Sequence, residues 1–257
     1  MNDAAPDTGA GTGARLGRPR VHLRLTDSTN ERARELAIAG APHGTLVTAS
    51  EQSAGRGRQG RRWSAPSGSA ILASLVLRSP PRLLPLIAAI AVCEVAGEGA
   101  AIKWPNDVVL LGADGTLAKL AGILIEARPQ QGWAVLGIGL NVAVRLDDLS
   151  PELRPGRPAA REPGVGLPAA TMGLTPSALE PTLARLLQAL EERLHEEPAS
   201  TLAAWRLRDA LLGREIAWSD GKGCAEGIDG DGRLIVALSG GGRAAIGAGE
   251  VHLERIG

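Results

Sequence analysis

The stretch that decides the fold is residues 101–142, AIKWPNDVVLLGADGTLAKLAGILIEARPQQGWAVLGIGLNV. Short apolar runs between Gly, Pro and Asp residues are typical of β-strands, and a glycine-containing turn between two of them predicts a hairpin. Pro105 ends the first run, and the turn GADG at 112–115 separates the second from the third. We therefore predict four strands here, at 101–104, 108–111, 120–127 and 133–142.

Further strands and helices are predicted on both sides of this centre. Ser28 and Glu31 have the spacing of a capping box, which predicts a helix of about ten residues that ends at Gly40. The order of the elements is not a regular alternation of strand and helix. It predicts an α+β fold, a mixed, largely antiparallel sheet with flanking helices. The additional strands are expected at 21–25, 45–50 and 70–77, and the additional helices at 85–96, 179–196 and 201–212.

The two ends of the chain differ from this middle part. Residues 1–20 are rich in Gly, Ala, Thr and Arg, so we expect a disordered tail and no secretory signal. Residues 150–168 contain five prolines and are expected to form a loop. From Gly213 onward, short apolar runs alternate with glycine turns. The predicted domains are therefore 1–20, a tail, 21–212, an α+β domain, and 213–257, a small barrel-like β unit with strands at 215–218, 234–238 and 250–255.

Composition excludes several classes of protein. The chain of 257 residues has 28 Lys and Arg and 28 Asp and Glu, so it carries no overall basic charge for nucleic acid. No apolar run reaches the roughly 18 residues that span a bilayer, so we expect no membrane contact. Cys93 and Cys224 fit neither a disulfide framework nor metal-ligand spacing, and the four histidines are scattered. A reducing cytoplasm is the expected location.

Residues 55–61, GRGRQGR, are the first candidate for a binding site. Glycines let the backbone approach a ligand closely, and arginines offer forked positive charge for phosphate. A dinucleotide site is rejected because a strand-like run, and no helix, follows the loop, and the Lys-Ser/Thr ending of a P-loop is also missing. The alternative is a solvated basic loop or an arginine-glycine segment that binds nucleic acid.

Three further motifs are candidates for the same site. KWPND at 103–107 places an amide and a carboxylate after a strand, although Asn and Asp are also ordinary turn residues. Lys119 interrupts an apolar strand. The alternative without a functional role is a lysine at the edge of the sheet whose charged end extends to solvent. GIGLN at 137–141 leaves one strand face without side chains, which favours either a flat ligand or a bulge.

The order and spacing of these motifs, with STN at 28–30 and KLAGI at 119–123, resemble those of the biotin protein ligases. The resemblance covers residues 20–145 and extends more weakly to the end of the chain. It implies a catalytic domain with the biotin/lipoate ligase fold and a small C-terminal SH3-like β-barrel. It also implies a two-step reaction: biotin and ATP form biotinyl-5′-AMP, and biotin then passes to a lysine of a biotin carboxyl carrier protein.

The resemblance also implies a role for each matching residue. Lys119, Arg56, Arg58 and Asp107 would be catalytic, the first three stabilising negative charge and Asp107 orienting the incoming lysine. ATP and the adenylate would contact Arg56, Arg58, Trp63, Asn106, Lys119 and Asn141, with Trp63 as the platform for adenine. Biotin would contact Ser28, Thr29, Asn30, Gln52, Arg56, Gly57, Arg58, Lys119, Gly122, Gly137 and Gly139.

Several alternatives stay open at this point. A lipoate or octanoate ligase belongs to the same superfamily, a nucleic-acid binder would use the arginine loop alone, and a degenerate ligase would only bind ligands. Ser28 lies too near the N-terminus for a preceding DNA-binding domain, so we expect no operator binding. Mg²⁺ is expected with ATP, although the sequence indicates no metal ligands. Both a monomer and a homodimer are compatible with the sequence.

Overall fold

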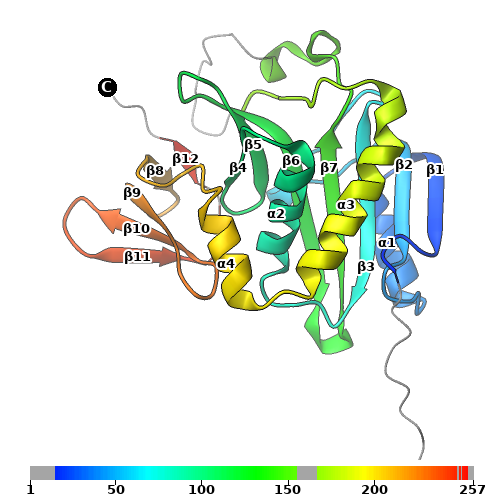
Figure 1. The fold of residues 1–257 in the computed structure, drawn as a ribbon, viewed down its shortest axis with the longest axis horizontal. Helices are drawn as coiled ribbons and strands as arrows, with labels where there is room; N and C mark the ends of the chain where they lie inside the picture. The colour runs from blue at the N-terminus through cyan, green and yellow to red at the C-terminus, as the bar shows by residue number, and fades with distance from the viewer. Residues whose placement is uncertain (1–14, 155–166, 248, 250, 254–257) are drawn as a thin grey trace, which may run out of the picture.

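A computed structural model describes residues 15–154, 167–247, 249 and 251–253 of the chain. Its larger sheet has the order β1-β2-β3-β7-β6-β5-β4 (Figure 1). β1 pairs with β2 in parallel, and every other neighbouring pair is antiparallel, which confirms the predicted mixed sheet. The strands are β1 (Arg20–Thr26), β2 (Leu46–Gln52), β3 (Ala70–Arg78), β4 (Ala100–Lys103), β5 (Asp107–Leu111), β6 (Leu117–Arg128) and β7 (Trp133–Asn141).

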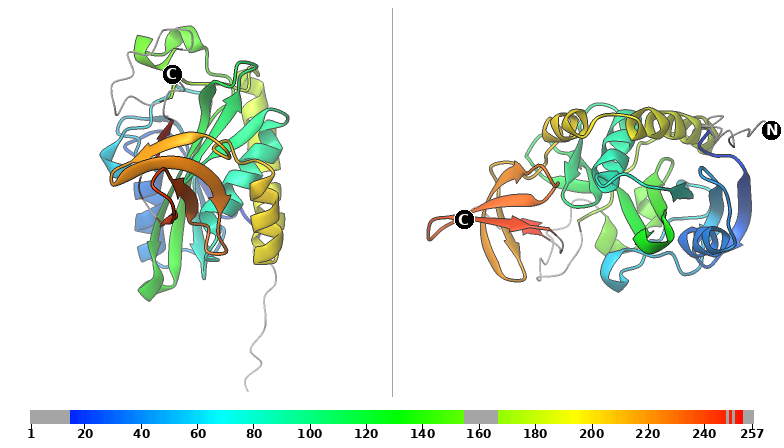
Figure 2. Two further views of the ribbon diagram at one scale, coloured as in Figure 1. Left: turned by 90° about the vertical axis from the view of Figure 1, so that its left-hand side faces the viewer. Right: turned by 90° about the horizontal axis from the view of Figure 1, so that it is seen from below.

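Helices cover both faces of this sheet. α2 (Leu84–Ala96) and α3 (Leu179–Leu194) lie in front of the sheet in Figure 1, while α1 (Thr29–Ile38) lies behind it. The turned views in Figure 2 place α4 (Pro198–Arg206) on the same side as α2 and α3. α2 is apolar almost all round because it is enclosed by the sheet and by neighbouring helices. In the described residues, no helix has the length and apolar character needed to span a bilayer.

The register of the central strands positions a patch of glycines. β7 lies between β3 and β6, and Gly139 pairs with Leu72 on one side and with Gly122 on the other. Gly137 lies two residues earlier on β7 and faces the same side of the sheet as Gly139. Three glycines therefore leave the α1 face of the central strands open to whatever packs on it.

The C-terminal unit is a second sheet with the order β11-β10-β9-β8-β12. Among the described strands β11 and β12 are not paired, so the described part of this unit is an open five-stranded sheet, which does not contradict the predicted barrel. β9 and β11 were not predicted, because glycines and polar residues interrupt their apolar pattern. The strands are β8 (Glu215–Trp218), β9 (Gly221–Ile228), β10 (Leu234–Leu238), β11 (Arg243–Ile246) and β12 (His252–Leu253).

Two predicted boundaries are wrong. The expected tail reaches residue 20, but Leu16 is buried in the main core and β1 begins at Arg20. Residues 1–14 of that tail lie outside the described residues, as do 155–166 of the proline-rich stretch. The helix predicted at 201–212 begins at Pro198 and ends at Arg206, because the chain then extends beside β4. There Ile102 N donates to Arg208 O at 2.6 Å, and Ala210 N donates to Ile102 O at 2.9 Å.

Candidate active site

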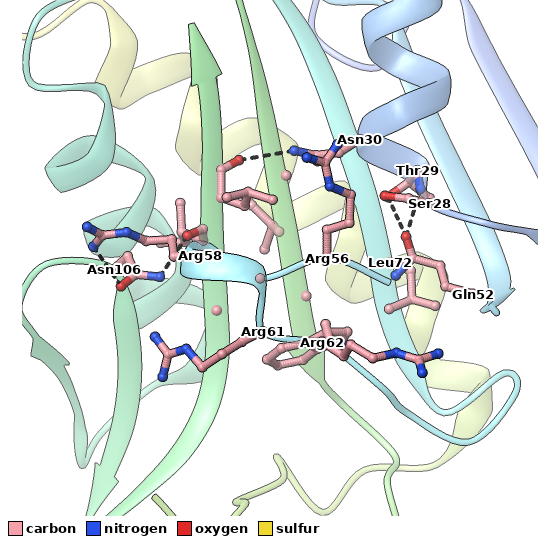
Figure 3. Close-up of a pocket in the computed structure, with 18 of the residues that line it drawn as sticks. Ser28, Thr29, Asn30, Gln52, Arg56, Arg58, Arg61, Arg62, Leu72 and Asn106 are labelled. Atoms are coloured by element: carbon pink, nitrogen blue, oxygen red, sulfur yellow. Dashed lines mark hydrogen bonds between the residues drawn. The ribbon is translucent and has the colours of Figure 1, made fainter. Parts of the chain in front are cut away.

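A cavity of about 310 Å³ opens on the α1 face of the sheet, between the N-terminus of α1, the 55–63 loop, β6 and β7 (Figure 3). This volume is at the lower end of the range for small-molecule sites. Leu72 and Leu124 pair with Gly139 and Gly137, so they face the cavity and supply apolar surface, although neither was among the predicted site residues. Most of the predicted site residues line the cavity: Ser28, Thr29, Asn30, Gln52, Arg56, Gly57, Arg58, Trp63, Asn106, Lys119, Gly122, Gly137 and Gly139.

The arginine-glycine loop folds back on itself over this cavity. Gly57 N donates to Arg61 O at 2.7 Å, and Trp63 N donates to Gly55 O at 3.0 Å. A Cβ at Gly55 would lie 2.3 Å from the carbonyl oxygen of Trp63, so only glycine fits this closure. The loop thus brings Trp63 back to the sheet.

The indole of Trp63 packs on the glycine patch. Ideal Cβ atoms at Gly139 and Gly122 would lie 2.4 Å and 3.0 Å from its ring atoms. The flat group over these two glycines is therefore a side chain of the protein itself. The indole N–H is buried and has no hydrogen-bond partner among the described residues. A buried donor of this kind favours an acceptor supplied by a ligand.

The N-terminus of α1 is held differently from the prediction. Ser28 occupies the N-cap position, but its side chain makes no capping hydrogen bond in the described structure, so the expected capping box is absent. Gln52 Oε1 instead accepts from Thr29 N at 2.7 Å. Glu31 is drawn away by two arginines: Arg34 donates hydrogen bonds to it and Arg56 lies beside it, which together hold the Glu31 pKa below its usual value.

Asp107 and Lys119 form an ion pair at the edge of the cavity. Lys119 Nζ lies 2.7 Å from Asp107 Oδ1 and 5.8 Å from the centre of the Trp63 ring. Asp107 itself is not part of the cavity lining, and Lys119 is the cavity residue that it contacts. The backbone of Lys119 is fixed by Pro168 and Ala170, whose main chains bond to its N–H and C=O at 2.6 Å and 2.7 Å.

Asn106 and Asn141 have different positions. Asn106 Nδ2 donates to Ile123 O at 2.9 Å, and its Oδ1 accepts from Arg58 at 3.2 Å, so it joins the loop to β6 at the cavity. Asn141 does not line the cavity. Its amide donates to Ala170 O at 2.9 Å in the protein interior. In this structure Asn141 therefore holds the 169–170 segment, which in turn positions Lys119.

KWPND also connects the two sheets, a role that the sequence did not indicate. Lys103 Nζ donates to Val251 O at 2.7 Å, and Trp104 Nε1 donates to Gly232 O at 3.0 Å. Both acceptors are backbone atoms of the C-terminal unit. The first two residues of the motif thus anchor that unit, while Asn106 and Asp107 face the site.

The charges around the cavity suit an anionic ligand. Arg58, Arg61, Arg62 and Lys119 line it, and Arg guanidinium groups match phosphate and carboxylate geometry. Among the described residues, no three His, Cys, Asp or Glu side chains gather as a metal site. The chemistry that this arrangement supports is stabilisation of negative charge next to an apolar pocket.

Comparison with known proteins identifies the family. The profile described as the biotin/lipoate A/B protein ligase family matches residues 22–142. The biotin–[acetyl-CoA-carboxylase] ligase of Paracoccus denitrificans is 35% identical over 253 residues, which cover 89% of this chain and 98% of that protein. The bifunctional ligase/repressor BirA of Bacillus spizizenii is 38% identical over 151 residues, which cover 54% of this chain and 45% of the relative. The match thus spans less than half of the Bacillus protein.

A solved structure agrees with these relatives. The biotin protein ligase from Aquifex aeolicus in complex with biotin and ATP superposes with a TM-score of 0.73 at 25% identity, over 93% of this chain and 99% of that chain. The fold is that of the biotin/lipoate ligase class. The chain belongs to the biotin protein ligase family, which confirms the resemblance seen in the sequence.

Proposed function

We propose that the chain is an ATP-dependent biotin protein ligase, which forms biotinyl-5′-AMP and then transfers biotin to a lysine of a carrier protein. One observation carries this proposal. A single cavity combines apolar side chains with Lys119 and the arginines of the 55–63 loop. An apolar ring with a carboxylate tail and a nucleotide triphosphate together require this combination.

The first half-reaction is limited by charge repulsion. An oxygen of the biotin carboxylate attacks the α-phosphorus of ATP, the bond to the β-phosphate breaks, and pyrophosphate leaves. Lys119, Arg58 and Arg61 line the cavity and would offset the negative charge of both reactants as they approach. Mg²⁺ would be held here mainly by the ATP phosphates, because no carboxylate of the described residues lines the cavity.

The second half-reaction needs a neutral amine. A lysine side chain has a pKa near ~10.4 and is mostly protonated at neutral pH. Asp107 is the carboxylate nearest to Lys119 and would accept the proton of the incoming amine. The amine nitrogen then forms the amide with the biotinyl carbon, and AMP leaves. The Asp107–Lys119 pair places the groups for both half-reactions next to each other.

The partner and the location follow from the same proposal. Relatives are named biotin–[acetyl-CoA-carboxylase] ligases, which supports the biotin carboxyl carrier protein of an acyl-CoA carboxylase as the acceptor. We propose a reducing cytoplasm as the location, as the cysteine pattern predicts. The absence of operator binding stays a prediction.

The experiment that tests the function is biotin-dependent exchange of labelled pyrophosphate into ATP, with magnesium and the purified chain. Biotin should support exchange, whereas lipoate and octanoate should not. Because the matching family profile also covers lipoate ligases, exchange with lipoate alone would reassign the substrate. No exchange with any of the three acids would contradict the ligase proposal.

A further inference from the structure

A chain of polar contacts runs from Gln52, at the end of β2, to Arg56 in the 55–63 loop. Gln52 Oε1 lies 3.1 Å from Thr29 Oγ1, and Ser74 Oγ lies 2.9 Å from the same hydroxyl. Ser74 Oγ also lies 2.7 Å from Asn30 Oδ1. This chain of contacts thus crosses from β2 to α1 and β3, and it continues from Asn30 to β6.

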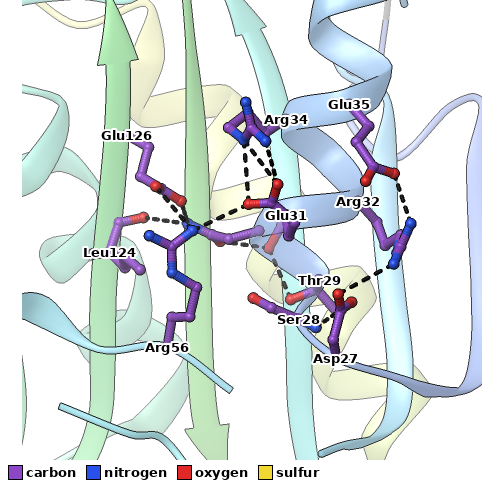
Figure 4. Close-up of polar contacts among 12 residues, drawn as sticks. Asp27, Ser28, Thr29, Glu31, Arg32, Arg34, Glu35, Arg56, Leu124 and Glu126 are labelled. Carbon is purple, nitrogen blue, oxygen red and sulfur yellow. Dashed lines mark hydrogen bonds and ion pairs between the residues drawn. The ribbon is translucent and has the colours of Figure 1, made fainter. Parts of the chain in front are cut away.

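Glu126, on β6, joins this chain of contacts to Arg56 of the 55–63 loop. Its two carboxylate oxygens have different partners: Asn30 Nδ2 donates to Oε2 at 2.9 Å, and Arg56 lies 3.3 Å from Oε1 (Figure 4). Only 17% of the Glu126 side chain is exposed. Arg56 also contacts Glu31 on α1 at 3.2 Å. Glu126 is therefore where the α1 end of the cavity meets the arginine-glycine loop.

Asn30 and Arg56 are both engaged by the protein and not aimed at a ligand. Asn30 Oδ1 occupies the space that Gly137 leaves open, since a Cβ there would lie 1.9 Å from this oxygen. Its amide nitrogen bonds to Glu126. Arg56 is held between two carboxylates, which neutralise its charge. Both residues line the cavity, and the polar groups of both contact Glu126.

We infer that Glu126 is a positioning residue. It connects Asn30, at the end of the cavity where biotin is expected, with Arg56, the first arginine of the loop. The inference rests on the proposed function. Loss of the carboxylate leaves the buried Asn30 amide with only the long 3.5 Å contact to Leu124 O, and it leaves Arg56 with Glu31 alone. The loop should then close less readily over biotin. The KM for biotin should rise, while kcat and the KM for ATP should stay close to the wild-type values.

Three variants separate the two contacts from a general loss of charge. Glu126→Gln keeps an acceptor for Asn30 but removes the negative charge beside Arg56, and Glu126→Ala removes both. Glu94→Gln is the matched control, because Glu94 is a half-buried carboxylate that pairs with Arg193 away from the cavity. Thermal melting of each variant establishes that it is folded before its kinetics are compared.

Two measurements test the inference. In pyrophosphate exchange, Glu126→Ala should raise the KM for biotin by on the order of tenfold, because hydrogen bonds to charged groups have this strength. Glu126→Gln should give a smaller rise, and Glu94→Gln none. Limited trypsin digestion, which cuts after the loop arginines, should be faster for both Glu126 variants, and biotin should protect them less than it protects the wild type.

The outcomes distinguish this inference from the proposed function. If wild-type protein shows no exchange with any acid, the proposed function fails, and the rate of trypsin cleavage still decides whether Glu126 holds the loop. If wild-type protein exchanges but both Glu126 variants match Glu94→Gln in the KM for biotin, the positioning role is overturned. A fall in kcat together with equal rises in the KM for biotin and the KM for ATP would also overturn the positioning role, since this result would indicate general damage to the fold.

Discussion

Lys119 Nζ and Asp107 Oδ1 lie 2.7 Å apart, so the two residues to which we assign different half-reactions form one ion pair. Their side chains are 24% and 10% exposed, and the contact lacks hydrogen-bond alignment at the Asp107 oxygen. Removal of either partner from a largely buried pair leaves the other charge uncompensated. Each substitution should therefore affect both steps, but to different degrees.

Lys119→Ala should mainly impair adenylate formation. Loss of one positioned donor from a charge-stabilising site lowers the rate by about 10²–10³-fold, because the negative charge of the reacting groups is no longer offset. Biotin-dependent pyrophosphate exchange measures this step. Lys222→Ala is the control, because Lys222 is an exposed lysine of the C-terminal sheet. Activity of the Lys119 variant close to that of the control would contradict the assigned role.

Asp107→Ala should mainly slow the transfer to the carrier lysine. The carboxylate that would accept the proton is lost, and general acid–base groups contribute about 10²–10⁴-fold. Transfer is measured from preformed biotinyl-5′-AMP to the carrier, and adenylate formation is measured separately by exchange. Exchange should also fall, because Lys119 loses its partner, but by less than the transfer step. Equal losses in both half-reactions for Asp107→Ala and Lys119→Ala would show that the division of roles is wrong.

The fold was largely predictable where the apolar pattern is continuous. The pattern of residues 101–142 predicted the four strands β4, β5, β6 and β7, and β3 and α2 followed from long apolar runs. β9 and β11 were missed, because glycines and charges at exposed positions hide their alternation. The end of α4 was misplaced because a tertiary contact decides it: backbone pairing with Ile102 draws residues 208–210 out of the helix.

The site was predictable at the level of motifs but not of contacts. Most of the residues that the motifs brought together line one cavity, but Asp107 and Asn141 do not. No local pattern indicates that Gln52 caps α1, that Trp63 covers Gly139, or that Glu126 and Ser74 join the network. These contacts depend on strand register and on the path of the loop, which sequence spacing alone does not fix.

Gly139→Ala should destabilise the fold through Trp63. The new Cβ would lie 2.4 Å from the indole ring, and overpacking of this kind costs about 1–3 kcal/mol. Urea unfolding measures the free energy of unfolding for each variant. Gly240→Ala is the control, because no atom lies within 4 Å of a Cβ at that position. Addition of Trp63→Ala should reduce the cost at Gly139, and an unchanged cost in the double variant would show that the indole is not the cause.

Asp209 should make the stability of the chain depend on pH. Burial raises the pKa of its carboxyl, although hydrogen bonds from the backbone of Leu211 and Leu212 lower it in part. Its Oδ1 accepts from Leu211 N at 2.8 Å, and Oδ2 is buried with no partner in the described part of the chain.

The direction of this effect follows from proton linkage. A carboxyl with a raised folded pKa contributes stability below its unfolded pKa, near ~3.9, and loses that contribution as the pH rises through the folded value. Asp209→Asn is neutral throughout and keeps an acceptor for Leu211. Wild-type protein should therefore lose stability relative to Asp209→Asn between about pH 4 and pH 7. Carboxyls with lowered pKa values, such as Asp27 and Glu31, act in the opposite direction but are common to both proteins and cancel. Urea unfolding at several pH values gives the free energy of unfolding of both proteins. If the wild-type value minus the Asp209→Asn value stayed constant or rose with pH, burial would not dominate at Asp209.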